Sequence, residues 1–270
     1  MPIITKITTQ AKNSERYNVY LDYGKGEEYG FSVDEYVLVK FQLKKGRELD
    51  ELDLTEIQYA DDVKKAYNLA LNYLSYRMRS KKEVHTYLKS KGIGEMIIQE
   101  VLHKLDDQRY IDDLEFAKAY ARTQRSTTVK GPNLIRKELK EKGIADEYID
   151  ISLMDFSDNE QLQTAIKIAD KTKGKNQKLS SSALRQKIEQ TLQQKGYSFT
   201  IIQQLFHEWG VEKEEDAEWE ALKHQGLKAH RRYEKYEGWE YERRMKQSLY
   251  RKGFAIEDIK RLLEELKSEE

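Results

Sequence analysis

The sequence predicts a mainly α-helical protein in which tandem three-helix repeats stack into an elongated solenoid, after a small N-terminal α+β module with a β-hairpin. Three observations predict this fold class. A phrase ending in Lys-Gly recurs four times, apolar residues around each copy follow helical spacing, and the 270-residue chain contains 2 prolines. A chain of this length exceeds one typical domain, so two domains or a repeat array is expected.

Residues 1–58 differ in character from the rest and predict the small α+β module. The stretch RYNVYLDYGKGEEYGFSV has two runs rich in Tyr, Val and Phe on either side of a Gly-Lys-Gly turn, which is typical of a hairpin. Ser32 with Glu35 three residues later has the form of a capping box, and it predicts a helix that ends at Gly46. The module is too short to bury a large core alone.

The remainder is an internal repeat, seen in the phrases TYLKSKGI, KELKEKGI, QTLQQKGY and QSLYRKGF. Their glycines are separated by 51, 53 and 57 residues. A leucine stands four positions before each glycine, an aliphatic residue or Met eight before, and an isoleucine six after. The glycines are Gly92, Gly143, Gly196 and Gly253, and the leucines are Leu88, Leu139, Leu192 and Leu249. This spacing predicts two amphipathic helices flanking each glycine, with the leucines in the core.

Each Lys-Gly pair predicts a helix stop, because a cation suits a helix C-terminus and glycine readily adopts the left-handed conformation. Ser80 with Glu83 predicts the start of the helix before the first glycine, and Pro132 suits a first helical turn. Another helix precedes this pair in every unit, with Asp112 and Ser157 as plausible caps. Four three-helix repeats are therefore expected, at residues 59–111, 112–158, 159–211 and 212–270.

The charge pattern predicts a binding surface from local clusters of basic residues, and not from the net charge of the chain. The 48 basic and 48 acidic residues balance, so the whole chain shows no preference for a polyanion. Basic residues nevertheless gather between the first and second helix of every repeat, and stacked repeats would align these loops in a basic stripe. The candidate partner-binding or DNA-binding residues are Arg77, Arg79, Lys81, Lys82, Arg122, Arg125, Lys130, Arg136 and Lys137. The corresponding clusters of the third and fourth repeats are Lys171, Lys173, Lys175 and Lys178, and Lys228, Arg231, Arg232 and Lys235. The alternative is a set of solvated loops without a partner.

Signals for catalysis are missing from the sequence. The chain lacks a phosphate-binding loop and an H-E-x-x-H pair, and it has no cysteine, which suits a reducing cytosol. The pairs Asp106–Asp107 and Asp112–Asp113 are better explained as helix ends and caps than as metal ligands. The N-terminus does not have the form of a signal peptide, and no apolar window approaches a membrane span. We expect a cytoplasmic, monomeric protein that is not an enzyme and uses no cofactor or metal.

The stretch ALNYLSYRMRSKKEVHTYLKSKGI, followed by VLHKLDDQRYIDDLEFAKAYARTQRSTTVKGPNLIRKELKEKGI, resembles the RecX regulatory proteins of bacteria. The likeness covers about residues 66–158, and the N-terminal module and fourth repeat are similar to the long, Gram-positive-type members. It implies an all-helical array of three-helix repeats without chemistry of its own. It also implies a partner, the RecA recombinase filament, whose assembly, ATP hydrolysis and strand exchange the family modulates in DNA repair, recombination and the SOS response.

Two functions therefore remain open from the sequence. The first is a modulator of the recombinase filament, most simply an inhibitor, that acts through protein contacts aided by the DNA backbone. The alternative is a helical-repeat protein that mainly binds single-stranded nucleic acid through the basic stripe, with the aromatic rings of Tyr76, Tyr233, Tyr236 and Trp239 beside the basic clusters as candidates for base stacking.

Overall fold

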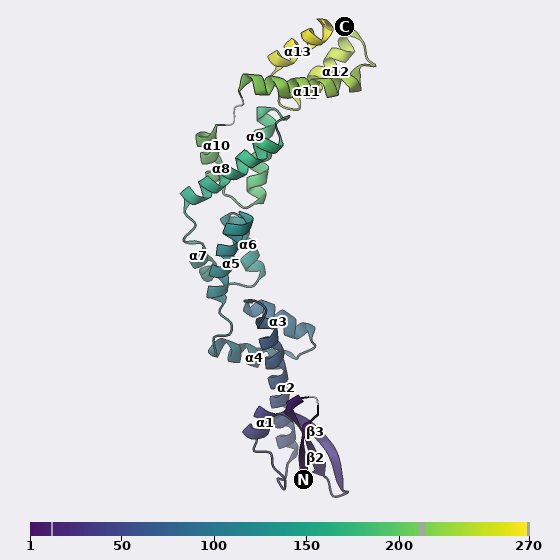
Figure 1. Ribbon diagram of the computed structural model, residues 1–270, viewed down its shortest axis with the longest axis vertical. Coiled ribbons are helices and arrows are strands. Elements are labelled where there is room, and N and C mark those ends of the chain that lie inside the picture. Colours follow the sequence, from purple (N-terminus) through teal and green to yellow (C-terminus); the bar gives the residue numbers. More distant parts are fainter. Residues whose placement is uncertain (12, 211–213, 269–270) are drawn as a thin grey trace. The chain divides into compact units, whose positions relative to one another are not determined.

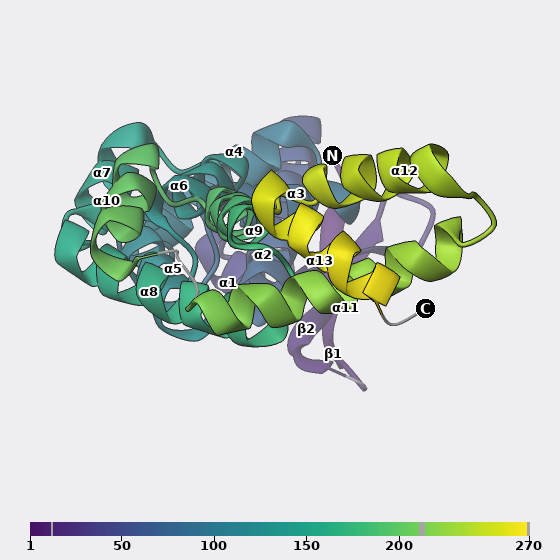
Figure 2. The ribbon, with the colours of Figure 1, turned by 90° about the horizontal axis from the view of Figure 1, so that it is seen from above.

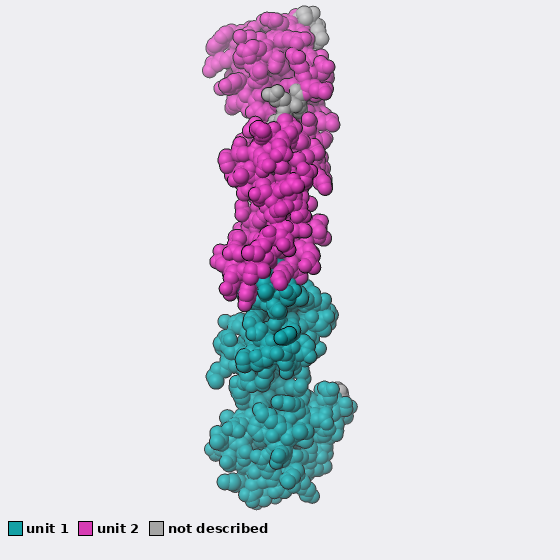
Figure 3. Space-filling model, turned by 90° about the vertical axis from the view of Figure 1, so that its left-hand side faces the viewer, with its two compact units in different colours: residues 1–117, 142–145 teal, residues 118–141, 146–270 magenta. Residues whose placement is uncertain are grey.

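The computed structural model describes residues 1–11, 13–210 and 214–268. In this part of the chain, three strands are followed by thirteen helices (Figure 1). The chain divides into two compact units, shown in teal and magenta in Figure 3. Unit 1 comprises residues 1–117 and 142–145, and unit 2 comprises residues 118–141 and 146–270.

The N-terminal module contains a three-stranded antiparallel sheet in the order β1-β2-β3. The predicted hairpin is confirmed as β2 (Asn13–Asp22) and β3 (Glu27–Asp34). The Asp22 carboxylate closes its turn by accepting the backbone N–H groups of the next Gly-Lys-Gly segment at 2.7–3.1 Å. The sequence analysis missed the edge strand β1 (Ile3–Gln10), whose pairing with β2 is interrupted by two register shifts. These irregularities break the alternation by which a half-buried strand is recognised.

The capping box predicted for the next helix is wrong. Helix α1 runs over Glu35–Lys40, and its N-cap is Asp34, whose carboxylate accepts the Tyr36 N–H at 3.0 Å. Ser32 is still part of β3, where its hydroxyl and carbonyl both accept from the Arg16 guanidinium. The helix also ends before Gly46, which adopts a φ of +86° in the following turn. Strand pairing extends further than expected, so the helix begins later.

Helix α2 (Glu51–Leu74) joins the module to the first repeat. Ile57 near its start packs in the core of the sheet, whereas Val63 and Ala70 belong to the core of the first repeat. The boundary expected between residues 58 and 59 therefore falls inside one continuous helix. Burial of apolar side chains on both halves of α2 couples the module to this repeat.

The twelve helices expected after the module are confirmed, in four groups of three. In the described residues beyond the module there is no strand. The first group is α2 with α3 (Lys81–Ser90) and α4 (Glu95–Asp107), and the second is α5 (Asp113–Thr128), α6 (Pro132–Glu141) and α7 (Asp146–Leu153). The third is α8 (Asp158–Lys175), α9 (Ser181–Gln194) and α10 (Phe199–Trp209), and the fourth is α11 (Glu215–Tyr233), α12 (Gly238–Tyr250) and α13 (Ile256–Ser268). The last three pack side by side in Figure 2.

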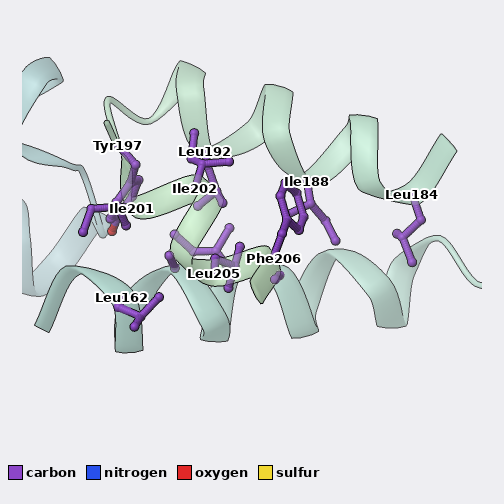
Figure 4. Close-up of a cluster of buried hydrophobic side chains, with 12 residues drawn as sticks. Leu162, Leu184, Ile188, Leu192, Tyr197, Ile201, Ile202, Leu205 and Phe206 are labelled. Atoms are coloured by element: carbon purple, nitrogen blue, oxygen red, sulfur yellow. The ribbon is translucent and has the colours of Figure 1, made fainter. Parts of the chain in front are cut away.

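The repeated leucines are core residues, as expected. Leu88, Leu139, Leu192 and Leu249 are all fully buried, as are the isoleucines six positions after each glycine. Figure 4 shows the arrangement in the third repeat, where Ile188 and Leu192 of α9 lie beside Leu205 and Phe206 of α10 in one cluster of buried side chains. Complete burial of one such side chain stabilises the fold by about 1.5–3 kcal/mol relative to exposure.

The predicted helix ends are also confirmed. The repeated glycines have φ values of +78°, +79°, +86° and +84°. The Ser80 hydroxyl and the Glu83 carboxylate exchange hydrogen bonds with each other's backbone N–H groups at the start of α3. Pro132 is the first residue of α6, and the side chains of Asp112 and Ser157 accept N–H groups at the starts of α5 and α8. The local rules for helix termini therefore located most boundaries from sequence.

Candidate partner-binding surface

The Lys-Gly phrase has a second structural role, because consecutive repeats meet there. The Ser80 hydroxyl at the start of α3 donates to the carbonyl of Lys142 at 2.8 Å. Two repeats later the Ser180 hydroxyl at the start of α9 donates to the carbonyl of Lys252 at 2.5 Å. Each acceptor is the lysine of a Lys-Gly pair. The start of the second helix in one repeat is thus bonded to the end of the second helix in the next.

The joint between the second and third repeats uses backbone donors instead. The Gly131 N–H donates to the Lys195 carbonyl at 2.7 Å, and the Asn133 N–H donates to the Gly196 carbonyl at 3.1 Å. A Cβ atom on Gly196 would lie 2.3 Å from the backbone N of Leu134. Glycine is therefore required both for its positive φ and for the close approach of the neighbouring repeat.

In the first repeat, an ion-pair cluster spans this joint. The Glu83 carboxylate receives the Arg77 guanidinium at 3.1 Å and the Lys142 ammonium at 2.9 Å. Partial burial alone would raise the pKa of Glu83, but the hydrogen bonds from Arg77 and Lys142 outweigh it and lower the pKa to about 2. Arg77, a candidate for partner contact, thus pairs within unit 1 with a carboxylate that also receives Lys142. We call Arg77, Glu83 and Lys142 the joint triad.

The other candidates of the first repeat also have partners within unit 1. The Arg79 guanidinium stacks over the Tyr73 ring at 4.1 Å, and the Lys81 ammonium pairs with Asp106 at 2.8 Å. The side chain of Lys82 packs over the Cα of Gly143, where a Cβ atom would be 2.7 Å away. Arg77 and Lys81 are therefore paired with carboxylates of the chain itself, whereas Arg79 lies on an aromatic ring and Lys82 on the backbone.

In the second repeat, two of the candidate basic residues differ from the others in having no ion pair to a described residue. Arg125 pairs with Glu160 at 3.3 Å, and the candidates Lys130 and Arg136 pair with the acidic residues Glu138 and Asp150 at 2.5 and 2.6 Å. Arg122 and Lys137 are exposed and form no ion pair with any residue that the structure describes. These two are the candidates of the second repeat whose charge is available to a partner.

The expectation that the basic clusters lie in loops needs correction. Arg122 and Arg125 are in α5, and Arg136 and Lys137 are in α6. The connection between these helices is short, because α5 continues to Thr128 and α6 begins at Pro132. The basic side chains of this repeat therefore project mainly from the helices themselves, and of these four only Arg125 lies in a last turn, where a cation is favourable.

The third and fourth repeats carry the unbalanced charge. Their eight basic residues form no ion pair in the described part of the chain, although Lys173 lies over the Trp209 ring and Arg232 over the Tyr233 ring. The residues are Lys171, Lys173, Lys175, Lys178, Lys228, Arg231, Arg232 and Lys235. Spacing alone could not distinguish these clusters from the first two, because the acidic partners of the earlier clusters come from other helices.

Unit 1 also has a groove that was not predicted from the sequence. It has a volume of about 480 Å³ and lies between α1, α2 and α4. Tyr36, Tyr59 and Tyr67 line it, and the Lys64 ammonium lies 5.6 and 5.7 Å from the ring centres of Tyr36 and Tyr67. The Tyr59 hydroxyl donates to Glu100 at 2.8 Å. The three helices that form the groove are separated in sequence, so no local sequence pattern predicts the groove.

The paired aspartates are occupied by structural contacts. Asp106 pairs with Lys81, and Asp113 accepts the Lys81 backbone N–H at 2.8 Å. The described residues contain no group of three or more His, Asp or Glu that could hold a metal ion. Among the helices of the described chain, none is both long and apolar enough to cross a membrane.

The comparisons with known families cover almost the whole chain. The model of the regulatory protein RecX N-terminal domain matches residues 2–50. Those of the first and second RecX three-helix domains match residues 66–105 and 112–153. The model of the third three-helix domain matches twice, at residues 158–206 and 216–263. The fourth repeat is therefore similar to a second copy of the third domain.

Individual relatives agree with these models. A regulatory protein RecX of Bacillus velezensis is 51% identical over 266 residues, which cover 98% of this chain and 99% of the relative. The regulatory protein RecX of Bacillus subtilis is 48% identical, with the same coverage.

Solved structures agree as well. A crystal structure of a regulatory protein RecX matches with a TM-score of 0.68 and 38% identity, over 77% of this chain and all of the other. RecX from Lactobacillus salivarius matches with a TM-score of 0.52 and 39% identity, over 55% of this chain and 97% of the other. The module, the succession of three-helix repeats and the near full-length identity lead to one conclusion: the chain belongs to the RecX family of regulatory proteins.

Proposed function

We propose that this chain binds the RecA recombinase filament and inhibits its recombinase and ATPase activities, without catalysing a reaction itself. The observation that carries the proposal is the near full-length identity to proteins named as regulatory proteins RecX. In this role the chain acts as a cytoplasmic monomer in DNA repair and recombination, including the SOS response. The absence of a catalytic motif in the sequence is consistent with a regulator.

The repeats supply a means of binding an extended partner. Each repeat adds a similar pair of helix ends, so contacts to a filament can be spread over many weak sites. Arg122 and Lys137 are exposed on the second repeat without ion pairs to described residues, and eight further basic residues follow in the third and fourth repeats. Acidic side chains of a recombinase or phosphates of its DNA would complement these charges.

ATP hydrolysis by filaments formed on single-stranded DNA tests this proposal. Adding the chain at a small fraction of the RecA concentration should lower the hydrolysis rate, because one bound array affects several subunits. The double variant Arg122→Glu/Lys137→Glu should inhibit less, whereas Lys104→Glu, at a residue already paired with Glu100, is a control at a position outside the proposed contacts. An unchanged hydrolysis rate at equimolar chain would refute inhibition.

The second candidate function is direct binding of single-stranded nucleic acid. Exposed aromatic side chains favour it: Tyr76 at the first joint is 85% exposed, and Trp239 at the start of α12 is 73% exposed. An Arg243 guanidinium also lies 5.2 Å from the Trp239 ring centre. Flat rings beside cations can stack on bases irrespective of sequence. Binding of a single-stranded oligonucleotide in the absence of RecA would distinguish this function.

A further inference from the structure

The contact between the third and fourth repeats contains a hollow bordered by basic side chains. The hollow has a volume of about 710 Å³, and its lining includes Lys173 and Lys178 from the third repeat and His224 from α11. The Nε2 atom of His224 is buried and has no hydrogen-bond partner in the described structure. Most buried polar atoms are paired, so this nitrogen is available to a ligand.

Hydrogen bonds at the joint hold the basic groups in place. The Gln225 side chain donates to the Lys178 carbonyl at 2.8 Å and accepts from the Lys252 ammonium at 2.8 Å. The Ser180 hydroxyl fixes the Lys252 backbone from the other side. Lys252 is the lysine of the fourth Lys-Gly phrase, so the repeat joint itself brings this ammonium group close to Lys178.

Helix α11 completes the group. His224, Lys228 and Arg232 are spaced four residues apart and therefore lie on one face of the helix. We call Lys178, His224, Lys228, Arg232 and Lys252 the junction cluster. Its members come from the α8–α9 connection, from α11 and from the turn after α12.

Acidic groups nearby do not neutralise the junction cluster. The Glu218 carboxylate accepts hydrogen bonds from the backbone N–H and from the hydroxyl of Ser181. Glu220 forms an ion pair with Lys223 at 3.6 Å. Glu214 also borders the hollow but forms no ion pair with a described residue. None of these carboxylates pairs with a cluster residue, so the positive charges face one another.

The protonation equilibria reflect this arrangement. Burial lowers the pKa of Lys252, and the charges of Lys228 and Arg232 lower it further. Burial likewise lowers the pKa of His224, together with the charges of Lys178, Lys228 and Lys252. Like charges held together destabilise the fold by repulsion, and a bound anion would relieve that repulsion.

We propose that the junction cluster binds a backbone phosphate of a nucleic-acid strand. A phosphodiester accepts several charge-assisted hydrogen bonds at once, which suits ammonium and guanidinium groups around a ring nitrogen. Further exposed cations follow on the same two helices, at Lys171 and Lys175 on α8 and at Arg231 on α11, and none of them has an ion pair with a described residue. They offer contacts for neighbouring phosphates, so a strand fits better than an isolated anion. The inference concerns the chain alone and does not depend on binding to RecA.

Fluorescence anisotropy with a labelled oligonucleotide tests the site. The triple variant Lys178→Gln/Lys228→Gln/Lys252→Gln removes three ammonium groups of the cluster. A neutralised phosphate contributes about 0.7 to the salt slope for a single strand, so loss of the one phosphate bound at the cluster should lower the slope by about 0.7. At 0.1 M salt this corresponds to a loss of affinity of about 5-fold. The unfolding midpoint should not fall, because the substitutions remove repulsion rather than ion pairs.

The matched control is Lys104→Gln/Lys140→Gln/Lys246→Gln, which changes the net charge equally. Each of these lysines is ion-paired, to Glu100, Asp146 and Glu242 respectively. The control should keep a salt slope close to that of the original chain. Equal losses in the two variants would overturn the proposal, because they would reflect net charge alone.

Three ligands show which kind of phosphate the cluster binds: a single-stranded oligonucleotide, a duplex oligonucleotide and inorganic phosphate. Binding of a single-stranded or a duplex oligonucleotide, weakened by the junction variant, supports the proposal and identifies the strand. Binding of inorganic phosphate with no binding of either oligonucleotide at 0.05 M salt would overturn it. Loss of filament binding with unchanged oligonucleotide binding would also overturn it, because the cluster would then contact protein. Since no recombinase is present in the anisotropy assay, its failure leaves the filament proposal untouched.

Discussion

The joint triad predicts a large, pH-dependent loss of stability on removing one charge. In Glu83→Gln the amide keeps the size of the side chain but cannot pair with the cations of Arg77 and Lys142. Both cations lie within 3.1 Å of the carboxylate in the original chain. We expect this single substitution to weaken the contact between the start of α3 and Lys142 within unit 1.

The magnitude follows from the pKa. The folded state lowers the pKa of Glu83 from 4.5 to about 2, and each unit corresponds to about 1.4 kcal/mol. The side chain is 17% exposed, so solvent screens the pair only in part. Allowing for that screening, the charge of Glu83 stabilises the fold by about 2–3 kcal/mol at neutral pH.

The sign of the pH dependence is fixed by the direction of the shift. A carboxylate with a depressed folded pKa contributes stability above its unfolded pKa and loses it as pH falls toward the folded pKa. The difference in unfolding free energy between the original chain and Glu83→Gln should therefore be full at pH 7 and shrink between about pH 5 and pH 2. Urea denaturation, followed by circular dichroism, measures this difference.

Glu240→Gln is the appropriate control. Glu240 is exposed and pairs with Arg244 four residues later on α12, where such pairs contribute about 0.3–0.5 kcal/mol. A Glu83→Gln variant no less stable than this control would refute the triad as a stabilising contact. So would a deficit that stays constant from pH 7 to pH 3.

Three further outcomes are expected. Leu139→Ala should lower the unfolding free energy by about 2–5 kcal/mol, because Leu139 is fully buried; a smaller loss in a denaturant titration would contradict its place in the core. Gly92→Ala should cost only the left-handed backbone penalty, about 1–2 kcal/mol, whereas Gly196→Ala should cost clearly more because its Cβ would overlap Leu134 of the preceding repeat; equal melting temperatures would exclude a steric role for Gly196. Arg122→Glu/Lys137→Glu should weaken filament binding with unchanged helicity, because neither residue has an ion pair with a described residue; undiminished binding would remove both from the contact surface.

Helix boundaries and core positions were predictable because the interactions that set them are local. The Ser80 capping box, the Pro132 helix start and the positive φ at Gly143 all depend on residues within one turn. The β1 strand and the Asp34 cap were not predicted. Both depend on how far the sheet pairing extends, and that pairing joins residues distant along the chain.

Of the candidate site, the sequence predicted which basic residues cluster along the chain but not which of them form ion pairs. Sequence identified the basic clusters, but Arg136 and Asp150 are in different helices, so their pairing follows from the tertiary fold. The joints were hidden for the same reason: Ser80 and Lys142 are 62 residues apart. An alignment on the glycines shows that the positions are equivalent in the repeats. It does not show that the N-cap serine of the second helix in one repeat contacts the lysine of the Lys-Gly pair in the next repeat.

The most direct test of the central claim is co-sedimentation of the chain with RecA filaments assembled on single-stranded DNA, at several salt concentrations. The same measurement is made with the bare DNA. The chain should sediment with filaments at 0.15 M salt and should do so more completely than with DNA alone. Equal recovery on filaments and bare DNA at every salt concentration would contradict a filament regulator and favour a nucleic-acid-binding protein.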